Sequence, residues 1–393
     1  MLTDFLLLFL LLLALATGWW LGRRDKSRRQ PPPGTLPDLS KDYFVGLNYL
    51  LNEQPDEAID TFVRALEVNS DTIETHIALG NLFRSRGESD RAVRVHQNLF
   101  ARPSLNREQS ERVQLELGKD FMAAGLLDRA ERLLKELVNN NSEVGRTSQV
   151  LLVDLYEREK EWQKAMHTLS SSLLKENPRL QKAAAHYACE LATELLAKNS
   201  FAAARKQLKQ AQALDAACIR ATLLMAQLEL QSGSAKSAIR LLLRLPGQDS
   251  SYVPAMLQTL VDAYLLLDQP RELASTLEKL LQEHKYTSIL LHLAETLRSL
   301  GHHQEALEKV SHYMRHQVSL KGVDYLIDLY LDQASGGERA HLITLRNLTR
   351  QLLEHKPEHQ CTSCGFQSVQ LYWQCPKCRE WGSIKPIVGL EGE

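Results

Sequence analysis

Residues 79–88 read Leu79-Gly80-Asn81-Leu82-Phe83-Arg84-Ser85-Arg86-Gly87-Glu88. Gly80 and Phe83 should share one face of a helix, because residues three apart are neighbours on a helical surface. Gly87 then marks the end of that helix, since glycine is the usual residue where a helix turns back. A second helical stretch follows, so the segment predicts a turn between two antiparallel helices.

The same pattern recurs with a period near 34 residues. Gly46, Gly80 and Gly118 are each followed three positions later by an aromatic residue and twelve positions later by an alanine. The small residues let the two helices of a unit approach closely, and the aromatic residues fill the gap between units. This spacing is typical of tetratricopeptide repeats, whose units stack because none can bury its apolar face alone.

The register continues through eight units and a degenerate ninth that ends near Lys356. The later equivalents of Gly80 and Gly118 are Val153, Ala192, Ala226, Val261, Ala294 and Ile327. Loops are expected in the longer steps, around Pro103 and around Pro178. In the seventh unit Leu273 breaks the small-residue pattern. The predicted fold is an all-α tetratricopeptide-repeat superhelical solenoid over residues 41–356.

Such a solenoid predicts a binding surface. Each unit contributes its first helix to one continuous face, and polar residues one and four positions after the small residue should point into its groove. The partner-binding candidates are therefore Asn81, Arg84, Asp154 and Glu157. The alternative is that these side chains belong to an ordinary solvated helix face.

Residues 1–21 are predicted to form a transmembrane anchor. The stretch 5–21 is apolar apart from one threonine and one glycine, and about 20 apolar residues span a bilayer. Trp19 and Trp20 suit the headgroup level, and the cations that follow, led by Arg23 and Arg24, keep the C-terminal side in the cytoplasm. A single-pass helix with a periplasmic N-terminus is expected.

Residues 22–40 form a basic, proline-rich linker that should hold the repeats off the membrane surface. A cleaved signal peptide is the competing interpretation, because Ala14-Leu15-Ala16 resembles a cleavage site. Signal peptides carry basic residues before the apolar run, whereas here they come after it. The charge order therefore favours an anchor.

Residues 357–393 contain two CxxC pairs, Cys361 with Cys364 and Cys375 with Cys378, separated by ten residues. Two such turns direct four thiolates at one point, which suits zinc or a single iron. One zinc ion is expected, with iron as the alternative metal and free or redox-active thiols as the alternative without metal. A closed four-thiolate shell has no open position for substrate, so the site is predicted to be structural.

Four other potential ligands are interpreted as structural residues. Cys189 and Cys218 lie alone in helical stretches and are expected to be buried small hydrophobes. His312 and His316 are one helical turn apart, but no acidic third ligand is placed with them. A second metal site is not predicted.

Composition and motifs exclude two broad classes of function. The formal net charge of −1 gives no field that would attract nucleic acid. The chain contains no GxxxxGK[ST], HExxH, GxSxG or GxGxxG motif, so the sequence offers no nucleotide site or nucleophile. Neither a nucleic-acid partner nor an enzymatic activity is predicted.

The apolar anchor with Gly22-Arg23-Arg24, the segment 79–88 and the C-terminal tail resemble the lipopolysaccharide assembly protein B family of Gram-negative bacteria. The resemblance covers essentially the whole chain. Its most specific parts are Leu371-Tyr372-Trp373-Gln374-Cys375-Pro376-Lys377-Cys378 and Trp381-Gly382-Ser383-Ile384-Lys385-Pro386-Ile387. It implies an inner-membrane adaptor with a rubredoxin-like knuckle packed on its repeats.

The resemblance also implies partners. The family helps a membrane-bound AAA+ zinc protease degrade the deacetylase that commits precursor to lipid A, and it answers to an inner-membrane protein that senses lipopolysaccharide. A tether would concentrate such an adaptor beside a membrane partner. The alternatives are a scaffold for another envelope complex and a rubredoxin-like electron carrier. The sequence leaves a homodimer open.

Overall fold

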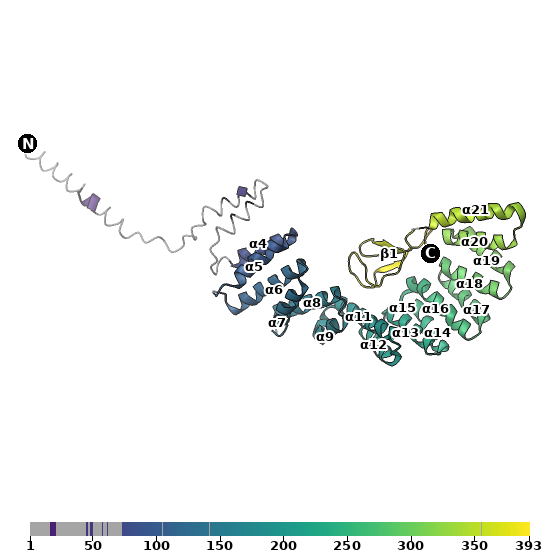
Figure 1. The fold of residues 1–393 in the computed structure, drawn as a ribbon, viewed down its shortest axis with the longest axis horizontal. Helices are drawn as coiled ribbons and strands as arrows, with labels where there is room; N and C mark the ends of the chain where they lie inside the picture. Colours follow the sequence, from purple (N-terminus) through teal and green to yellow (C-terminus); the bar gives the residue numbers. More distant parts are fainter. Residues whose placement is uncertain are drawn as a thin grey trace, which may run out of the picture. The chain divides into compact units, whose positions relative to one another are not determined.

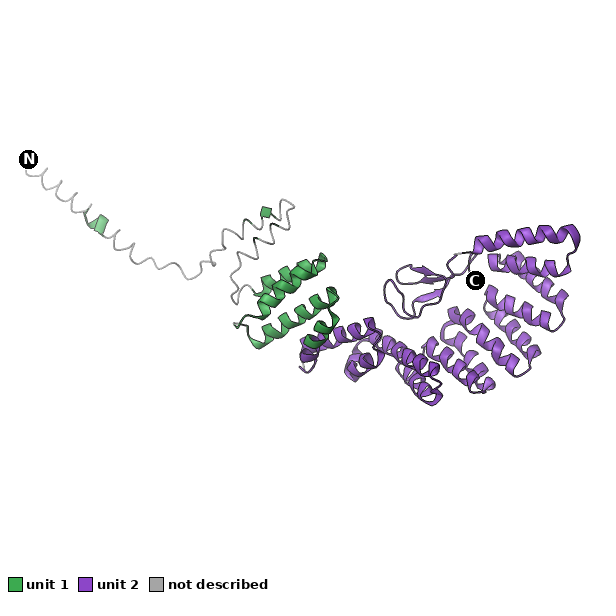
Figure 2. Cartoon of the chain, in the orientation of Figure 1, with its two compact units in different colours: residues 1–133 green, residues 134–393 purple. Residues whose placement is uncertain are grey.

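The computed structural model describes residues 16–20, 45, 48, 49, 57, 61, 73–103, 105–140, 142–354 and 356–393. Most of the predicted anchor, the linker with Arg23 and Arg24, and most of the first repeat lie outside these residues. Trp19 and Trp20 are helical, and their side chains are exposed. Among the described residues, none of the helices has both the length and the apolar character needed to cross a membrane. The chain forms two compact units, Met1–Leu133 and Leu134–Glu393 (Figure 2).

The described part of the first unit consists of paired helices (Figure 1). Asn106 begins the third of them with a capping box, because its side chain accepts from the Gln109 N–H while the Gln109 side chain accepts from the Asn106 N–H. The preceding loop contains Pro103, where the sequence predicted an insertion. The helices are α4 (Ile73–Ser85), α5 (Ser89–Phe100), α6 (Arg107–Ala123) and the beginning of α7 (Leu127–Val138).

The second unit continues the helix pairs along an arc, with a small sheet on the inner side of the arc (Figure 1). The helix pairs are α8 (Glu143–Arg158) with α9 (Trp162–Thr168), α11 (Pro178–Ala197) with α12 (Phe201–Leu214), α13 (Ile219–Gln231) with α14 (Ala235–Leu242), α16 (Val253–Leu266) with α17 (Pro270–Glu283), α18 (Thr287–Ser299) with α19 (His303–His316), and α20 (Leu320–Gln333) with α21 (Gly336–Leu353).

Short helices are inserted between some pairs. Helix α10 (Ser171–Glu176) precedes Pro178, where the sequence predicted an insertion. Helix α15 (Leu245–Asp249) and the 3₁₀ turn η1 (Ser250–Tyr252) were not predicted, because they leave the repeat spacing almost unchanged.

One backbone feature marks each helix pair from α4–α5 to α18–α19. The turn inside each pair has one residue with positive φ, always seven positions after the equivalent of Gly80: Gly87, Gly125, Lys160, Asn199, Gly233, Asp268 and Gly301. The next N–H bonds back to the end of the first helix, as in Glu88 to the Phe83 carbonyl at 2.9 Å. The helix pairs therefore follow the predicted register, including the seventh unit, where Leu273 is buried in α17.

The C-terminal residues form a three-stranded antiparallel sheet in the order β2-β1-β3. The strands are β1 (His359–Cys361), β2 (Gln367–Ser368) and β3 (Ile384–Pro386). The core of this knuckle, residues 357–393, is small, because its buried apolar cluster consists of Cys361, Cys375 and Ile384. Metal binding would therefore have to supply much of its folding free energy.

Gly80 has a packing role in the first unit. A Cβ on Gly80 would lie 2.3 Å from the ring of His96, which is fully buried in α5. The His96 ring is held by a hydrogen bond between its Nδ1 and the buried carboxylate of Asp120 in α6. The other Asp120 oxygen accepts from Arg84 at 2.7 Å. A small residue is thus required where the ring crosses α4.

We expect Gly80→Ala to destabilise the first unit. The added Cβ would overpack the site, because His96 cannot move away without breaking its bond to Asp120. Overpacking costs about 1–3 kcal/mol, whereas alanine gains only about 1 kcal/mol over glycine in helix propensity. Gly337→Ala in α21 is the matched control, since no atom lies within 4 Å of its added Cβ. Thermal unfolding and hydrogen exchange in α4 to α6 measure the difference. Equal stability of the two variants would contradict the close approach.

Candidate metal centre and its docking surface

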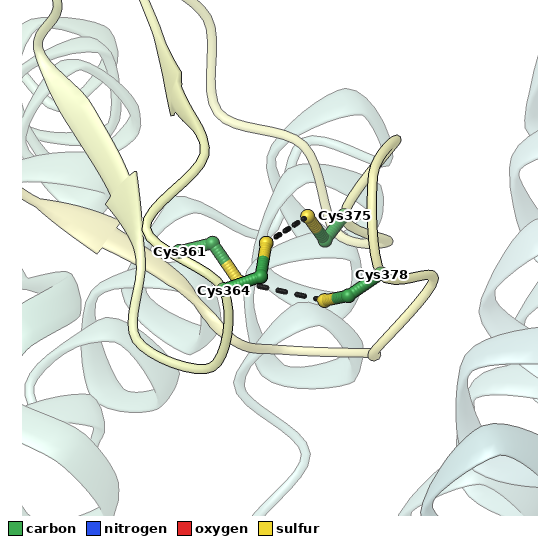
Figure 3. A group of neighbouring side chains, drawn as sticks. All are labelled: Cys361, Cys364, Cys375 and Cys378. Carbon is green, nitrogen blue, oxygen red and sulfur yellow. Dashed lines mark hydrogen bonds between the residues drawn. The ribbon is translucent and has the colours of Figure 1, made fainter.

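Two turns bring the four cysteines of the knuckle together (Figure 3). Their Sγ atoms all lie within 4.8 Å of one another. Cys361 Sγ is 3.7 Å from Cys378 Sγ, and Cys364 Sγ is 3.6 Å from Cys375 Sγ. Four sulfurs bound tetrahedrally at about 2.3 Å from zinc would be about 3.8 Å apart. The residues therefore fit a four-coordinate thiolate site.

The two turns share one backbone design. The Gly365 N–H donates to the Cys361 carbonyl at 3.0 Å, and the Arg379 N–H donates to the Cys375 carbonyl at 2.8 Å. Gly365 and Arg379 both have positive φ, 73° and 60°. This conformation costs a non-glycine residue about 1–2 kcal/mol. Arg379 thus occupies a position where glycine would be more stable, and the contacts of its side chain explain why.

Two of the four thiols differ in how easily they ionise. Burial raises the pKa of Cys361, but hydrogen bonds from the Ser383 hydroxyl and from the backbone N–H groups of Cys364 and Ser363 lower it to about 6. A hydrogen bond from the Glu380 N–H lowers the pKa of Cys378, but burial and the three neighbouring thiols raise it to about 12. Without a metal the neighbouring sulfurs thus oppose ionisation of Cys378, and a bound divalent cation would supply the charge that lets all four thiols ionise.

Glu157 of α8 joins the knuckle to the repeats. Its carboxylate is 10% exposed and accepts from Arg379 at 2.7 Å, from Gln374 at 2.7 Å and from Trp381 Nε1 at 2.9 Å. It also accepts from the Tyr187 hydroxyl of α11. Burial and the Glu157 charge raise the pKa of Tyr187, so this hydroxyl keeps its proton and donates. We call Glu157, Tyr187, Gln374, Arg379 and Trp381 the Glu157 cluster.

Aromatic packing supports the knuckle at two places. Trp381 stacks on His186 of α11, with ring centroids 4.8 Å apart, and meets Tyr187 and Trp162 edge-on. Trp373 stacks on Tyr252 of η1 at 5.6 Å. The Tyr252 hydroxyl donates to the Ile384 carbonyl at 2.9 Å, which ties the unpredicted insertion to β3.

The groove candidates have partners within the chain. Asp154 accepts from Arg379 at 2.9 Å, and Glu157 belongs to the cluster above, so both lie beneath the chain's own knuckle. In the first unit, Arg84 donates to Asn81 at 2.6 Å and to Glu116 and Asp120 at 2.7 Å each. Binding of a partner protein by these four residues stays a prediction.

The remaining ligand-type residues lie in the helical repeats. Cys189 and Cys218 are buried, with their Sγ atoms 4.0 Å apart. His312 and His316 face each other, with ring centroids 5.1 Å apart. Within the described part of the chain, the four knuckle cysteines are the only group of three or more residues placed to hold a metal.

Comparison with known proteins follows this division of the chain. A family model described as a rubredoxin metal binding domain matches residues 359–386, and tetratricopeptide repeat models match residues 75–108 and 189–253. Lipopolysaccharide assembly protein B of Escherichia coli K12 is 35% identical over 98% of this chain and 99% of its own length. The protein of that name from Haemophilus influenzae is 33% identical over the same shares.

This chain belongs to the lipopolysaccharide assembly protein B family. The resemblance inferred from the sequence is thereby confirmed. Among solved structures, a tetratricopeptide repeat protein from Parabacteroides merdae matches 66% of this chain and 99% of its own, at 16% identity and a TM-score of 0.34. A likeness of that size carries no argument about function.

Changing Cys375 and Cys378 to serine is expected to abolish metal binding. The helical circular dichroism should remain mostly intact, because a solenoid is stabilised by contacts between neighbouring repeats. Elemental analysis of the purified full chain, with one metal ion expected per chain, and circular dichroism check both points. Metal retained by the double variant, or loss of most of its helical signal, would contradict this separation.

Glu157→Gln is expected to release the knuckle without emptying the metal site. Removing one partner of a buried ion pair costs about 3–5 kcal/mol, and less is expected here because Arg379 is 32% exposed. Endoproteinase Glu-C should then cut faster after Glu354, the exposed residue that follows α21, while the metal content stays unchanged. Glu194→Gln, which changes an exposed residue of α11, is the control. Equal cutting rates for the two variants would exclude Glu157 as the docking residue.

Proposed function

We propose that this chain is a membrane-tethered adaptor that regulates lipopolysaccharide biosynthesis. The family relationship over nearly the full length supports this assignment. The Glu157 cluster is the observation that carries it, because its hydrogen bonds join the four-cysteine knuckle to the repeats in one surface. The closed shell of four thiolates leaves no position for substrate or activated water, which favours binding over catalysis.

The proposed adaptor surface combines the first helices of the repeats with the knuckle. Arg379 and Lys385 of the knuckle reach Asp154 and Asp249 of the repeats, both at 2.9 Å. A partner that contacts both parts would depend on metal binding, because the knuckle has too small a core to fold alone. We propose zinc as the metal, which the same elemental analysis tests against iron.

We further propose three partners for this surface and its tether. They are a membrane-bound AAA+ zinc protease, the deacetylase that commits precursor to lipid A, and an inner-membrane protein that senses lipopolysaccharide. Residues 1–21 would cross the inner membrane once, with the N-terminus in the periplasm and the repeats and knuckle in the cytoplasm. Tethering raises the effective concentration of a scaffold near a membrane protein, so that weak contacts suffice.

Deleting residues 1–21 tests the adaptor function. The shortened protein should stay folded and metal-loaded and still bind the deacetylase, but it should no longer promote its degradation in cells. Deacetylase half-life, measured by immunoblotting after translation is stopped, should lengthen to that of cells lacking the protein. An unrelated N-out transmembrane helix in place of residues 1–21 is the matched control and should restore degradation at least in part.

Two outcomes would contradict the proposal. Undiminished deacetylase turnover with the anchorless protein at native expression level would exclude the tether. A deacetylase half-life that is unchanged when the whole chain is absent would exclude the deacetylase as client and favour a scaffold for another envelope complex.

A further inference from the structure

A small cavity lies between the knuckle and the repeats, apart from the metal centre. It has a volume of about 200 Å³. Three basic side chains line it, Lys182 and His186 from α11 and Arg220 from α13, while Trp373 and Gly382 of the knuckle lie opposite. Its remaining charged lining residues are Asp215 and Asp249.

The basic side chains have hydrogen-bonding groups without partners. Arg220 donates to Glu190 at 2.8 Å through one terminal nitrogen, yet its Nε is buried with no partner. His186 is 3% exposed, and its Nδ1 also has no partner. Lys182 forms no ion pair or hydrogen bond with any residue of the described part of the chain. Buried polar groups are rarely left in this state, so the chain itself supplies no hydrogen-bond partner for Arg220 Nε and His186 Nδ1.

The two carboxylates of the cavity already have donors. Asp249 accepts from Lys385 at 2.9 Å and from the Ser251 N–H at 3.0 Å, and Asp215 accepts from the Ala217 N–H at 2.9 Å. Burial lowers the pKa of His186, and the charges of Arg220 and Lys182 lower it further, to about 3. Both charged groups that lower the pKa of His186 are cations, which indicates a positive electrostatic potential at its imidazole ring.

We propose that this cavity binds one small oxyanion of the phosphate or sulfate class, held by Lys182 Nζ, Arg220 Nε and the ring of His186. The volume is below the roughly 300–1,000 Å³ of sites for drug-sized ligands, but it holds an ion with a few waters. Arginine and lysine are the side chains that proteins use for phosphate groups. The competing content is water alone, which could also satisfy the free donors.

Gly382 keeps this space open. Its φ is 59°, and a Cβ there would lie 3.3 Å from Lys182 Nζ and 3.4 Å from His186 Nε2. The oxyanion would contact α11 and α13 under the loop that contains Gly382 and Trp381, the residue that stacks on His186. Bound anion should therefore stabilise the docked knuckle, since a ligand stabilises the state that binds it.

Isothermal titration of inorganic phosphate into the full, metal-loaded chain tests this site, at constant ionic strength in chloride buffer. One saturable site is expected, and sulfate should compete for it. Lys182→Met should weaken phosphate binding about tenfold or more, because the variant loses one charge-assisted hydrogen bond to the ion. Lys198→Met, which changes an exposed lysine at the end of the same helix, should leave the affinity unchanged. Lys182→Met is expected to fold, and Arg220→Lys tests the second cation.

Vesicles separate two sources of the oxyanion. If the group belongs to a lipid headgroup, the chain should bind phosphatidic acid vesicles more strongly than phosphatidylcholine vesicles, and the excess should depend on Lys182. If the ligand is a free ion, phosphate should saturate the site and phosphatidic acid vesicles should show no such excess. The absence of saturable phosphate binding up to millimolar concentration would overturn the proposal and leave water as the content. Equal weakening by Lys182→Met and Lys198→Met would also overturn it, because it would indicate general charge attraction.

Discussion

The carboxylate of Glu157 and its four donors connect the two ends of the second unit. A repeat solenoid is stabilised mainly by contacts between neighbouring units, so its parts far apart in sequence do not otherwise meet. Glu157 and Asp154 bond to residues 217 to 225 positions later in the chain. This carboxylate is 10% exposed, and three of its four donors come from the knuckle, so removing it would leave those buried donors without an acceptor.

The donors are in turn positioned by the metal turns. Gln374, Arg379 and Trp381 flank Cys375 and Cys378, so the second CxxC turn presents all three side chains to α8. The positive φ of Arg379 costs about 1–2 kcal/mol relative to glycine, and its bonds to Asp154 and Glu157 offset that cost. Docking of the knuckle on the repeats therefore depends on the fold of the second CxxC turn, which a bound metal would stabilise.

This arrangement changes what the groove can do. The first-helix face of a repeat solenoid is usually a binding surface, but in the second unit the knuckle covers Asp154 and Glu157 there. A partner of this unit would meet a composite surface made of helices and knuckle. In the first unit, Arg84 is bonded to Glu116 and Asp120 while its side chain stays 20% exposed. Burial raises the pKa of Glu116, but hydrogen bonds from Lys119 and then from Arg84 lower it below its usual value.

The sequence alone determined the features that rest on local physics. The repeat period, the turn at Gly87 and the grouping of the four cysteines follow from side-chain size, backbone freedom and ligand spacing within a few tens of residues. Lys160, Asn199 and Asp268 stand in three turns where other repeats have glycine, and the structure alone showed their positive φ.

Only the tertiary structure decided which side chains meet. It placed Asp154 and Glu157 under the knuckle, His96 against Gly80, and Tyr252 of an unpredicted insertion beside Trp373. It also gathered Lys182, His186 and Arg220 around one cavity. The physical reason is the same in each case. A polar or aromatic residue on a helix has the same local signature whether it faces solvent or a distant part of the chain, and its burial depends on how successive repeats rotate and where the knuckle folds back.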